Sequence, residues 1–454
     1  MTMLDLALRG LRHRAGGFLA TLLATVLGAT ILMAFASLLD TAAGPGVDAA
    51  SGETLVTMTA VAGGWCLLIV VFAVASTLTL SVSQRAAEMA LLRSVGATPA
   101  QVRRMIIVEA GGLATVAAVL AVAPGLLLGG WVFRLLRQTG QVDPAVGYRF
   151  GAAALGVGLG VTVLGATLAA LLTARRVTRR RAAGAALTDP PGADRLGRRR
   201  TALAALLLAT GLGCGVVTAT VMSGKGAEAM QTAGQAGIWC AIGLALLAPA
   251  LVRRAAAVVT RLLGARVGIT GELTVTNLRG RSGELAGVVM PIILFTAIST
   301  GTLYMQRIED RAPAVVGFVP EAVQRNITTL NYVVVGMIAL FAAIMLVNTV
   351  VAVITHRRRE FGQQRLAGAT GRQVSAMVTL EVLVLAATGV LFGSAAALVT
   401  IVPYGIARTG SVVATTGPDL YAGIVAVGVA LTLAASLLAT RRVLRAPAVA
   451  AVAG

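Results

Sequence analysis

The chain has 454 residues, of which 57% are hydrophobic and only 12% are charged, whereas a soluble globular domain carries about 25% charged residues. Its mean hydropathy of +0.87 requires apolar segments that face lipid, which excludes an ordinary soluble protein. The net charge of +20 does not indicate nucleic-acid binding, because the arginines cluster between the apolar runs, as topology determinants do.

Ten apolar runs are each near or above the ~20 residues that a helix needs to cross a bilayer. The abundance of small residues, including 53 glycines, favours a helical bundle over a β-barrel. We therefore expect an all-α integral membrane protein with ten transmembrane helices, the first retained as a span and not cleaved as a signal peptide. The runs cover 17–39, 55–82, 105–133, 150–173, 201–222, 237–259, 285–305, 329–354, 376–403 and 420–440.

The arginines predict the orientation of these spans. Most of the 38 Lys and Arg residues fall in alternate intervals between the runs, beginning with the segment before the first run. The positive-inside rule then places both termini in the cytoplasm, and we expect a multi-pass protein of the bacterial inner membrane.

An internal repeat divides the chain. At a constant offset of 272, the segment from Gln84 to Ala110 matches the segment from His356 to Val382. The matching positions hold identical residues in many places. Arg85 pairs with Arg357, Glu88 with Glu360, Arg93 with Arg365, Gly96-Ala97-Thr98 with Gly368-Ala369-Thr370, and Glu109 with Glu381. Spans 1–4 and 7–10 are therefore expected to be two parallel four-helix repeats joined by spans 5–6.

The predicted boundaries follow from this repeat. They are a first four-span unit over 1–176, a cytoplasmic linker over 177–200, two connecting spans over 201–265, a second four-span unit over 266–445 and a tail over 446–454. Three Gly-x3-Gly pairs, which begin at Gly125, Gly156 and Gly211, predict close helix contacts. Pro249 is expected to kink the sixth span.

The repeated segment predicts a short polar helix, a break and a second helix that enters the next span. Gly96 and Gly368 suit the left-handed residue that ends a helix, and Thr98 and Thr370 suit the N-cap of the following helix. Because a helix at the lipid interface needs only one apolar side and one polar side, the duplicated spacing favours a recognition surface for a soluble partner.

The pattern E-x-A-L-L-R-S-V-G-A-T-x-x-Q-V from Glu88 closely resembles the FtsX-like domain of MacB-type ABC transporter permeases. The resemblance covers about 55–176 and 329–443. In that family the segment is the coupling helix that docks on a separate ATPase. The resemblance implies ATPase contacts from two sets of residues, Glu88, Arg93, Gly96, Ala97 and Thr98, and Glu360, Arg365, Gly368, Ala369 and Thr370.

The ATPase is expected in another chain. The only lysine, Lys225, does not belong to the G-x-x-x-x-G-K-[ST] motif that holds nucleotide phosphates. The resemblance thus implies a permease, not an enzyme, without a cofactor of its own, that works with two copies of an ABC ATPase carrying ATP and Mg²⁺. Unlike family members with a large extracytoplasmic domain, the chain has only short intervals at 40–54 and 306–328. The lack of a large extracytoplasmic domain favours a substrate that is amphiphilic, lipid-like or antimicrobial. We expect the protein to export this substrate or to extract it from the bilayer.

Two alternatives stay open. An ion-coupled secondary transporter would need buried acids; Glu109 and Glu381 could relay protons, or could pair with Arg103, Arg104 or Arg372. An ATPase-linked sensor or scaffold would signal without transport. No metal site or catalytic residues are expected, since the chain has only two histidines.

Overall fold

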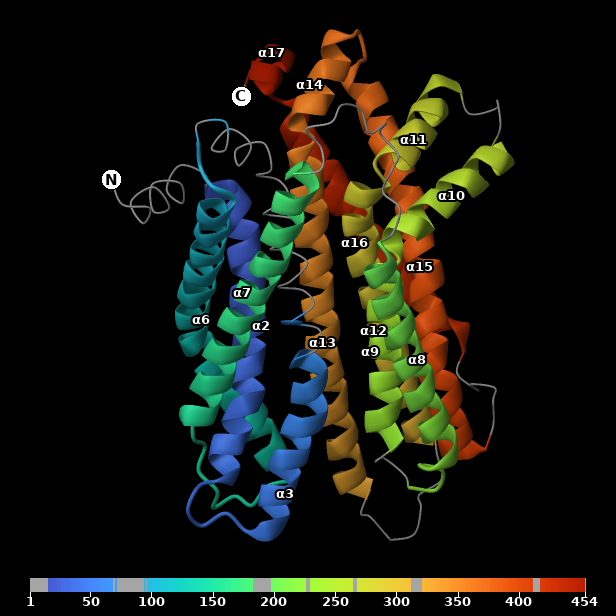
Figure 1. The fold of residues 1–454 in the computed structure, drawn as a ribbon. Helices are drawn as coiled ribbons and strands as arrows, with labels where there is room; N and C mark the ends of the chain where they lie inside the picture. The colour runs from blue at the N-terminus through green and yellow to red at the C-terminus, as the bar shows by residue number, and fades with distance from the viewer. Residues whose placement is uncertain are drawn as a thin grey trace. The chain divides into compact units, whose positions relative to one another are not determined.

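The structure is a computed structural model in which every regular element of the described residues is helical (Figure 1). It describes residues 15–67, 70–71, 94, 96–182, 197–225, 229–263, 268–311, 321–410 and 417–453. The chain divides into two compact units. The first comprises residues 1–188 and 316–334, and the second comprises residues 189–315 and 335–454. The division falls inside the linker predicted over 177–200, and the two predicted connecting spans belong to the second unit.

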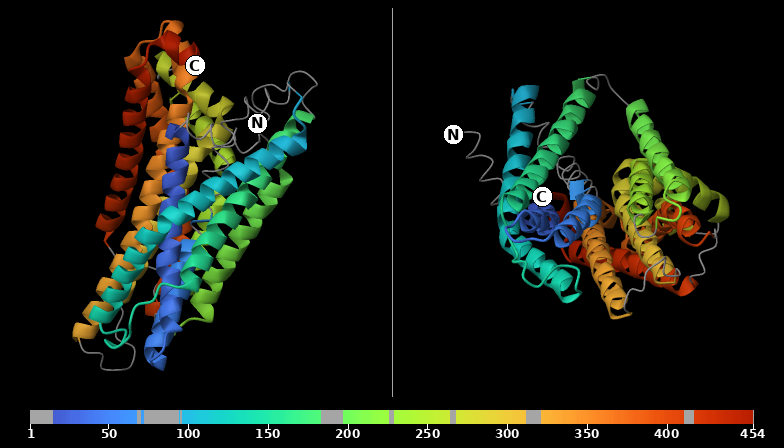
Figure 2. Two further views of the ribbon diagram at one scale, coloured as in Figure 1. Left: turned by 90° about the vertical axis from the view of Figure 1, so that its left-hand side faces the viewer. Right: turned by 90° about the horizontal axis from the view of Figure 1, so that it is seen from below.

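In the first unit, three long helices lie side by side (Figure 2). They are α2 (Ala15–Ala42), α6 (Pro99–Gln138) and α7 (Ala152–Ala182). A short helix, α3 (Ala49–Met58), continues into one turn of π-helix, η1 (Thr59–Gly63). Residues 68–69 and 72–82 of the predicted second span lie outside the described residues.

The second unit holds the remaining helices. The long ones are α8 (Arg198–Thr220), α9 (Ala229–Leu246), α12 (Ser282–Arg311), the later part of α13 (Glu321–His356), α15 (Gly371–Thr409) and α16 (Pro418–Leu444). Shorter helices gather at one end of this unit (Figure 1): α10 (Ala248–Leu263), α11 (Gly268–Gly280), α14 (Arg358–Leu366) and α17 (Ala448–Ala453). The predicted tail thus contains a helix, α17, which packs against α14.

Seven described helices are long and apolar enough to cross a membrane. They correspond to the predicted spans 1, 3, 4, 5, 7, 9 and 10, so the protein is an all-α, multi-pass membrane protein. The predicted eighth span lies in α13, whose described apolar part, Ala342–His356, is shorter than a full span.

The sixth span, predicted over 237–259, is not one straight helix. Helix α9 ends at Leu246, and α10 leaves it at an angle of 67°. Pro249 has no N–H to continue the hydrogen bonds of α9, and the charges of Arg253 and Arg254 disfavour a continued path through hydrocarbon. The position of the predicted kink, Pro249, was correct. The bend of 67° is much larger than that of a helix that kinks but still crosses the membrane as one span.

Small residues allow close helix contacts. A Cβ at Gly125 would lie 3.0 Å from the Cβ of Met33 in α2, and a Cβ at Gly211 would lie 2.7 Å from the carbonyl oxygen of Ala236 in α9. These contacts confirm two of the three predicted Gly-x3-Gly contacts. No described atom comes within 4 Å of a Cβ at Gly156 or Gly160, so the described residues show no such contact for the third pair.

Asp40, near the end of α2, caps the start of α7. Its carboxylate accepts hydrogen bonds from the backbone N–H groups of Gly151, Ala153 and Ala154 at 2.9, 2.8 and 2.8 Å. A helix start has N–H groups without partners in the helix. Asp40 therefore ties two membrane helices together through the backbone of one of them.

We expect Asp40→Ala to lower the free energy of unfolding by about 1–2 kcal/mol, as the loss of an N-cap does. Asp40→Asn should cost less, because its amide oxygen still accepts a hydrogen bond. Unfolding by sodium dodecyl sulfate titrated into detergent micelles measures both values. Equal stability of Asp40→Ala and the unmodified chain would contradict this role.

Candidate functional site

The repeated Gly-Ala-Thr motif forms a tight elbow between α14 and α15. Gly368 adopts φ +101° and donates its N–H to Arg365 O at 3.1 Å, while Ala369 N donates to Gln364 O at 3.0 Å. These two bonds form a Schellman motif. Thr370 then begins α15 with a capping box, in which Gln373 N donates to Thr370 Oγ1 at 3.2 Å and Thr370 N donates to Gln373 Oε1 at 2.8 Å.

The described part of the first copy has the same elbow. Gly96 has φ +103°, and Thr98 caps α6 through a capping box with Gln101. Thr98 N donates to Gln101 Oε1 at 2.8 Å. The left-handed glycines and the threonine caps were predicted correctly from the sequence. Glu88 and Arg93 lie outside the described residues.

A buried arginine lies at the base of α14. Arg357 is 4% exposed and precedes the first residue of α14. Its guanidinium donates to Glu381 Oε2 of α15 at 2.5 Å and to Glu360 Oε2 of α14 at 3.0 Å. It also lies 5.0 Å above the ring of Phe361. One cation therefore connects two acids on the two helices that meet at the elbow.

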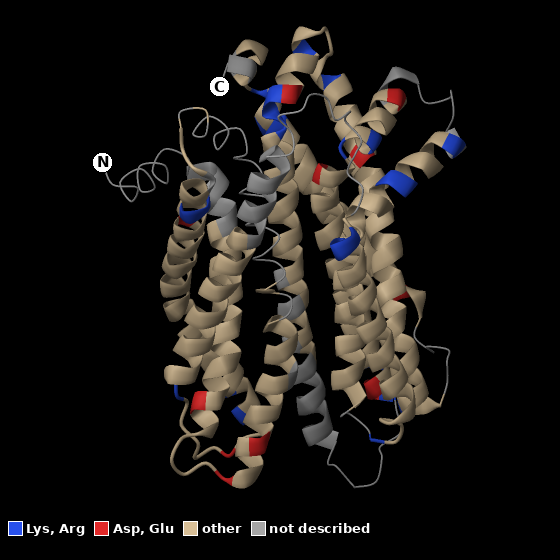
Figure 3. Ribbon diagram, viewed as in Figure 1, with Lys and Arg blue, Asp and Glu red and all other residues tan. Residues whose placement is uncertain are grey.

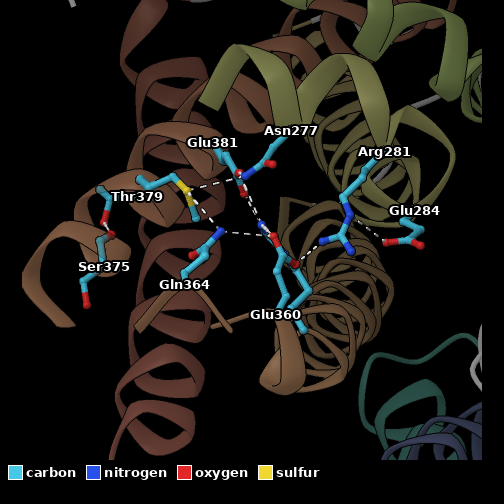
Figure 4. A network of polar contacts seen from close by, with 10 residues as sticks. Asn277, Arg281, Glu284, Glu360, Gln364, Ser375, Thr379 and Glu381 are labelled. Carbon is cyan, nitrogen blue, oxygen red and sulfur yellow. Dashed lines mark hydrogen bonds and ion pairs between the residues drawn. The ribbon is translucent and has the colours of Figure 1, made fainter. Parts of the chain in front are cut away.

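Two more helices join this network (Figure 4). Arg281, at the junction of α11 and α12, forms an ion pair with Glu360. Asn277 of α11 donates to Glu381 Oε1 at 2.7 Å. Glu381, which is fully buried, was expected to pair with Arg372 if its role were structural. Its role in an ion pair is as expected, but the partner is Arg357.

Glu360 stays ionised in this environment. Burial raises its pKa, but hydrogen bonds and charge from Arg357, together with the charge of Arg281, outweigh burial and lower the pKa below its ordinary value of 4.5. A carboxyl group with a lowered pKa stabilises the fold above the ordinary value, and this contribution is lost as the pH falls through the lowered one. The network is therefore intact at neutral pH.

Arg365 connects α14 to the end of α16. Its guanidinium donates to the carbonyl oxygens of Leu444 and Ala446 at 3.1 and 2.7 Å. Carbonyl groups at a helix end have no partner in the helix, and a cation is favourable there. The repeated residues Glu360, Arg365, Gly368 and Thr370 thus all have partners within the chain, which explains their spacing without a soluble partner.

The exposed face of α14 and the elbow is made by other side chains. Leu366 is 57% exposed. The exposed residues beside it are Arg358, Arg359, Gln363, Ala367, Gly368, Thr370 and Gln373, and Ala369 is half-buried. Leu366 and Asn277 were not identified from the sequence.

Comparison with known families identifies this arrangement. The sequence model of the FtsX-like permease C-terminal domain matches residues 60–177 and 332–448, which together make up a little over half of the chain. The chain belongs to the FtsX-like permease family. Each match includes one Gly-Ala-Thr elbow, so the duplication seen in the sequence is a duplication of this domain.

The FtsX-like assignment agrees with the helical, multi-pass fold. FtsX-like permeases are typically membrane subunits without enzymatic activity, and they generally work with an ABC ATPase partner. No curated protein matches the chain. The two matched domains agree closely with the two segments, about 55–176 and 329–443, at which the resemblance was found.

Proposed function

We propose that this FtsX-like permease is the transmembrane subunit of an ABC transporter. Two copies of a separate ATPase subunit, which bind ATP and Mg²⁺, dock on α14 and on the matching segment at 84–102. Their closure moves the two repeats and drives the export or membrane extraction of an amphiphilic, lipid-like or antimicrobial compound. The chain itself supplies no nucleotide site, since its sequence contains no P-loop motif.

The firm attachment of α14 to the membrane helices supports this proposal most strongly. Arg357 and Glu381 tie it to α15, Glu360 and Arg281 tie it to α12, and Arg365 ties it to α16. A push on its exposed face therefore reaches three long helices at once. A helix that only bordered lipid would not need three separate polar attachments.

The charge distribution of the second unit supports a cytoplasmic position for α14. The arginines of α10, α11, α14 and the end of α16 gather at one end of this unit (Figure 3). The other end of its long helices carries fewer cations, paired with acids: Arg408 Nε donates to Glu309 at 2.7 Å and Arg307 pairs with Asp419 at 3.3 Å. The positive-inside rule places the arginine-rich end in the cytoplasm, and the bacterial inner membrane is the expected location.

Substitution of Leu366 tests the docking. We expect Leu366→Glu to lower the number of P-loop ATPase copies recovered with the tagged, full-length chain from native membranes from two to one, because the charge replaces an exposed apolar contact at one of the two docking sites. Leu273, 46% exposed on α11, lies at the same end of the unit, so Leu273→Glu is the matched control and should retain the ATPase. Mass spectrometry identifies the subunit, and the mass of the complex gives its copy number.

The outcome separates the alternatives. Two ATPase copies retained by Leu366→Glu, as by the control, would remove α14 as a docking site. Transport by the purified chain in proteoliposomes with a proton gradient and no ATP would favour an ion-coupled carrier instead. ATPase binding without ATP-driven transport would indicate a sensor.

A further inference from the structure

Helix α10 departs from the direction of the membrane helices. It has 16 residues and leaves α9 at 67°. The break is stabilised by Arg200 of α8, whose Nε donates to Leu246 O at 2.7 Å, so the last carbonyl of α9 has a partner. In Figure 1, α10 extends outward from the end of the second unit that holds α14.

Helix α10 has one buried face and one exposed basic face. Ala248, Leu251, Val252 and Ala256 are buried, and α10 packs against α12 and α11. The exposed positions Arg254, Val258 and Arg261 recur at i, i+4 and i+7, which places them on one side of a helix. Val258 is 50% exposed.

The basic face extends onto α11. Arg279, an exposed residue of α11, donates from Nη2 to Thr260 Oγ1 of α10 at 3.1 Å. The sequence of α10 from Ala248 to Leu263 contains three arginines and no acidic residue. The face therefore combines an apolar side chain with cations on both sides of it.

We propose that α10 lies in the membrane interface and binds the phosphate groups of anionic phospholipids through Arg254, Arg261 and Arg279. A basic amphipathic helix lies along the surface with its apolar side chains about 5–10 Å into the headgroup boundary, and Val258 supplies that contact. Guanidinium groups bind phosphate oxygens with two parallel hydrogen bonds. This surface is separate from the ATPase docking face of α14 and does not depend on it.

Two measurements on the full-length chain test the proposal. In the first, a nitroxide label is attached at Val258→Cys after replacement of Cys66, Cys214 and Cys240 by alanine. In vesicles of phosphatidylcholine with phosphatidylglycerol, we expect the label to lie at the headgroup boundary, shielded from a water-soluble relaxing agent. A label at Gln363→Cys on α14 should be open to that agent. A fully water-exposed label at 258 would overturn the proposal.

In the second, native mass spectrometry follows phosphatidylglycerol binding to the purified chain. We expect Arg254→Gln/Arg261→Gln to weaken the tightest binding about thirty-fold, which corresponds to about 1 kcal/mol for each arginine near a charged surface. Arg358→Gln/Arg359→Gln removes the same charge from α14 and should leave binding unchanged. The proposal would be overturned if both double variants bound lipid equally well. It would also be overturned if Arg254→Gln/Arg261→Gln lost the ATPase while its lipid binding stayed unchanged.

Discussion

Replacing Arg357 with methionine should lower the free energy of unfolding by about 3–5 kcal/mol, the usual cost of removing one partner from a buried ion pair. Methionine keeps much of the apolar contact with Phe361, but it leaves Glu381 buried with only Asn277 as a described hydrogen-bond partner. Glu360 suffers less, because it keeps its ion pair with Arg281. Denaturation in micelles measures the loss, and ATP hydrolysis by the bound ATPase shows whether coupling survives.

A double variant separates the charge from the packing. In Arg357→Met/Glu381→Met both members of the buried pair become apolar, and such replacements are often neutral. We expect most of the lost stability to return. If the double variant were as unstable as Arg357→Met alone, the guanidinium would stabilise the fold through its packing and not by compensating the charge of Glu381.

Gly393→Leu should lower the free energy of unfolding by about 3 kcal/mol, at the upper end of the cost of overfilling a packed interior. A Cβ at this position of α15 would lie 2.7 Å from the Cβ of Thr296 and 2.9 Å from the carbonyl oxygen of Ile293, both in α12. Because one of these atoms is backbone, relief requires the two helices to separate.

Gly213→Leu in α8 is the matched control. No described atom comes within 4 Å of a Cβ at Gly213, so leucine there adds helix propensity without a clash. We expect this variant to be as stable as the unmodified chain. A similar loss in both variants would attribute the effect to the glycine backbone and not to contact between α12 and α15.

The features predicted correctly from the sequence are local. Gly368 and Thr370 act on groups within six residues, so the composition of the segment was enough to predict the turn and the cap. The positions of the seven spans found among the described residues followed from hydropathy alone. The repeat also indicated the duplicated domain, because identical residues at a constant offset need no structure to be recognised.

The partners of the charged residues could not be predicted in the same way. Glu381 is bound by Arg357 and by Asn277, which lies 104 positions away, and no periodicity relates them. The family resemblance implied contacts of Glu360 and Arg365 with an ATPase, yet both side chains have partners inside the second unit. Their contact with an ATPase stays a prediction, while the exposed Leu366 became evident only from the fold.

The elbow after α14 leaves no slack in the backbone. Three residues end one helix and begin the next, with the N–H groups of Gly368, Ala369 and Thr370 all bonded. Helix α15 then runs for 39 residues, about 58 Å at 1.5 Å per residue, to Arg408, which holds Glu309 of α12. A tilt imposed at the near end is therefore carried by one continuous helix as far as Pro403, where the ring and the missing N–H let the helix bend just before it reaches Arg408.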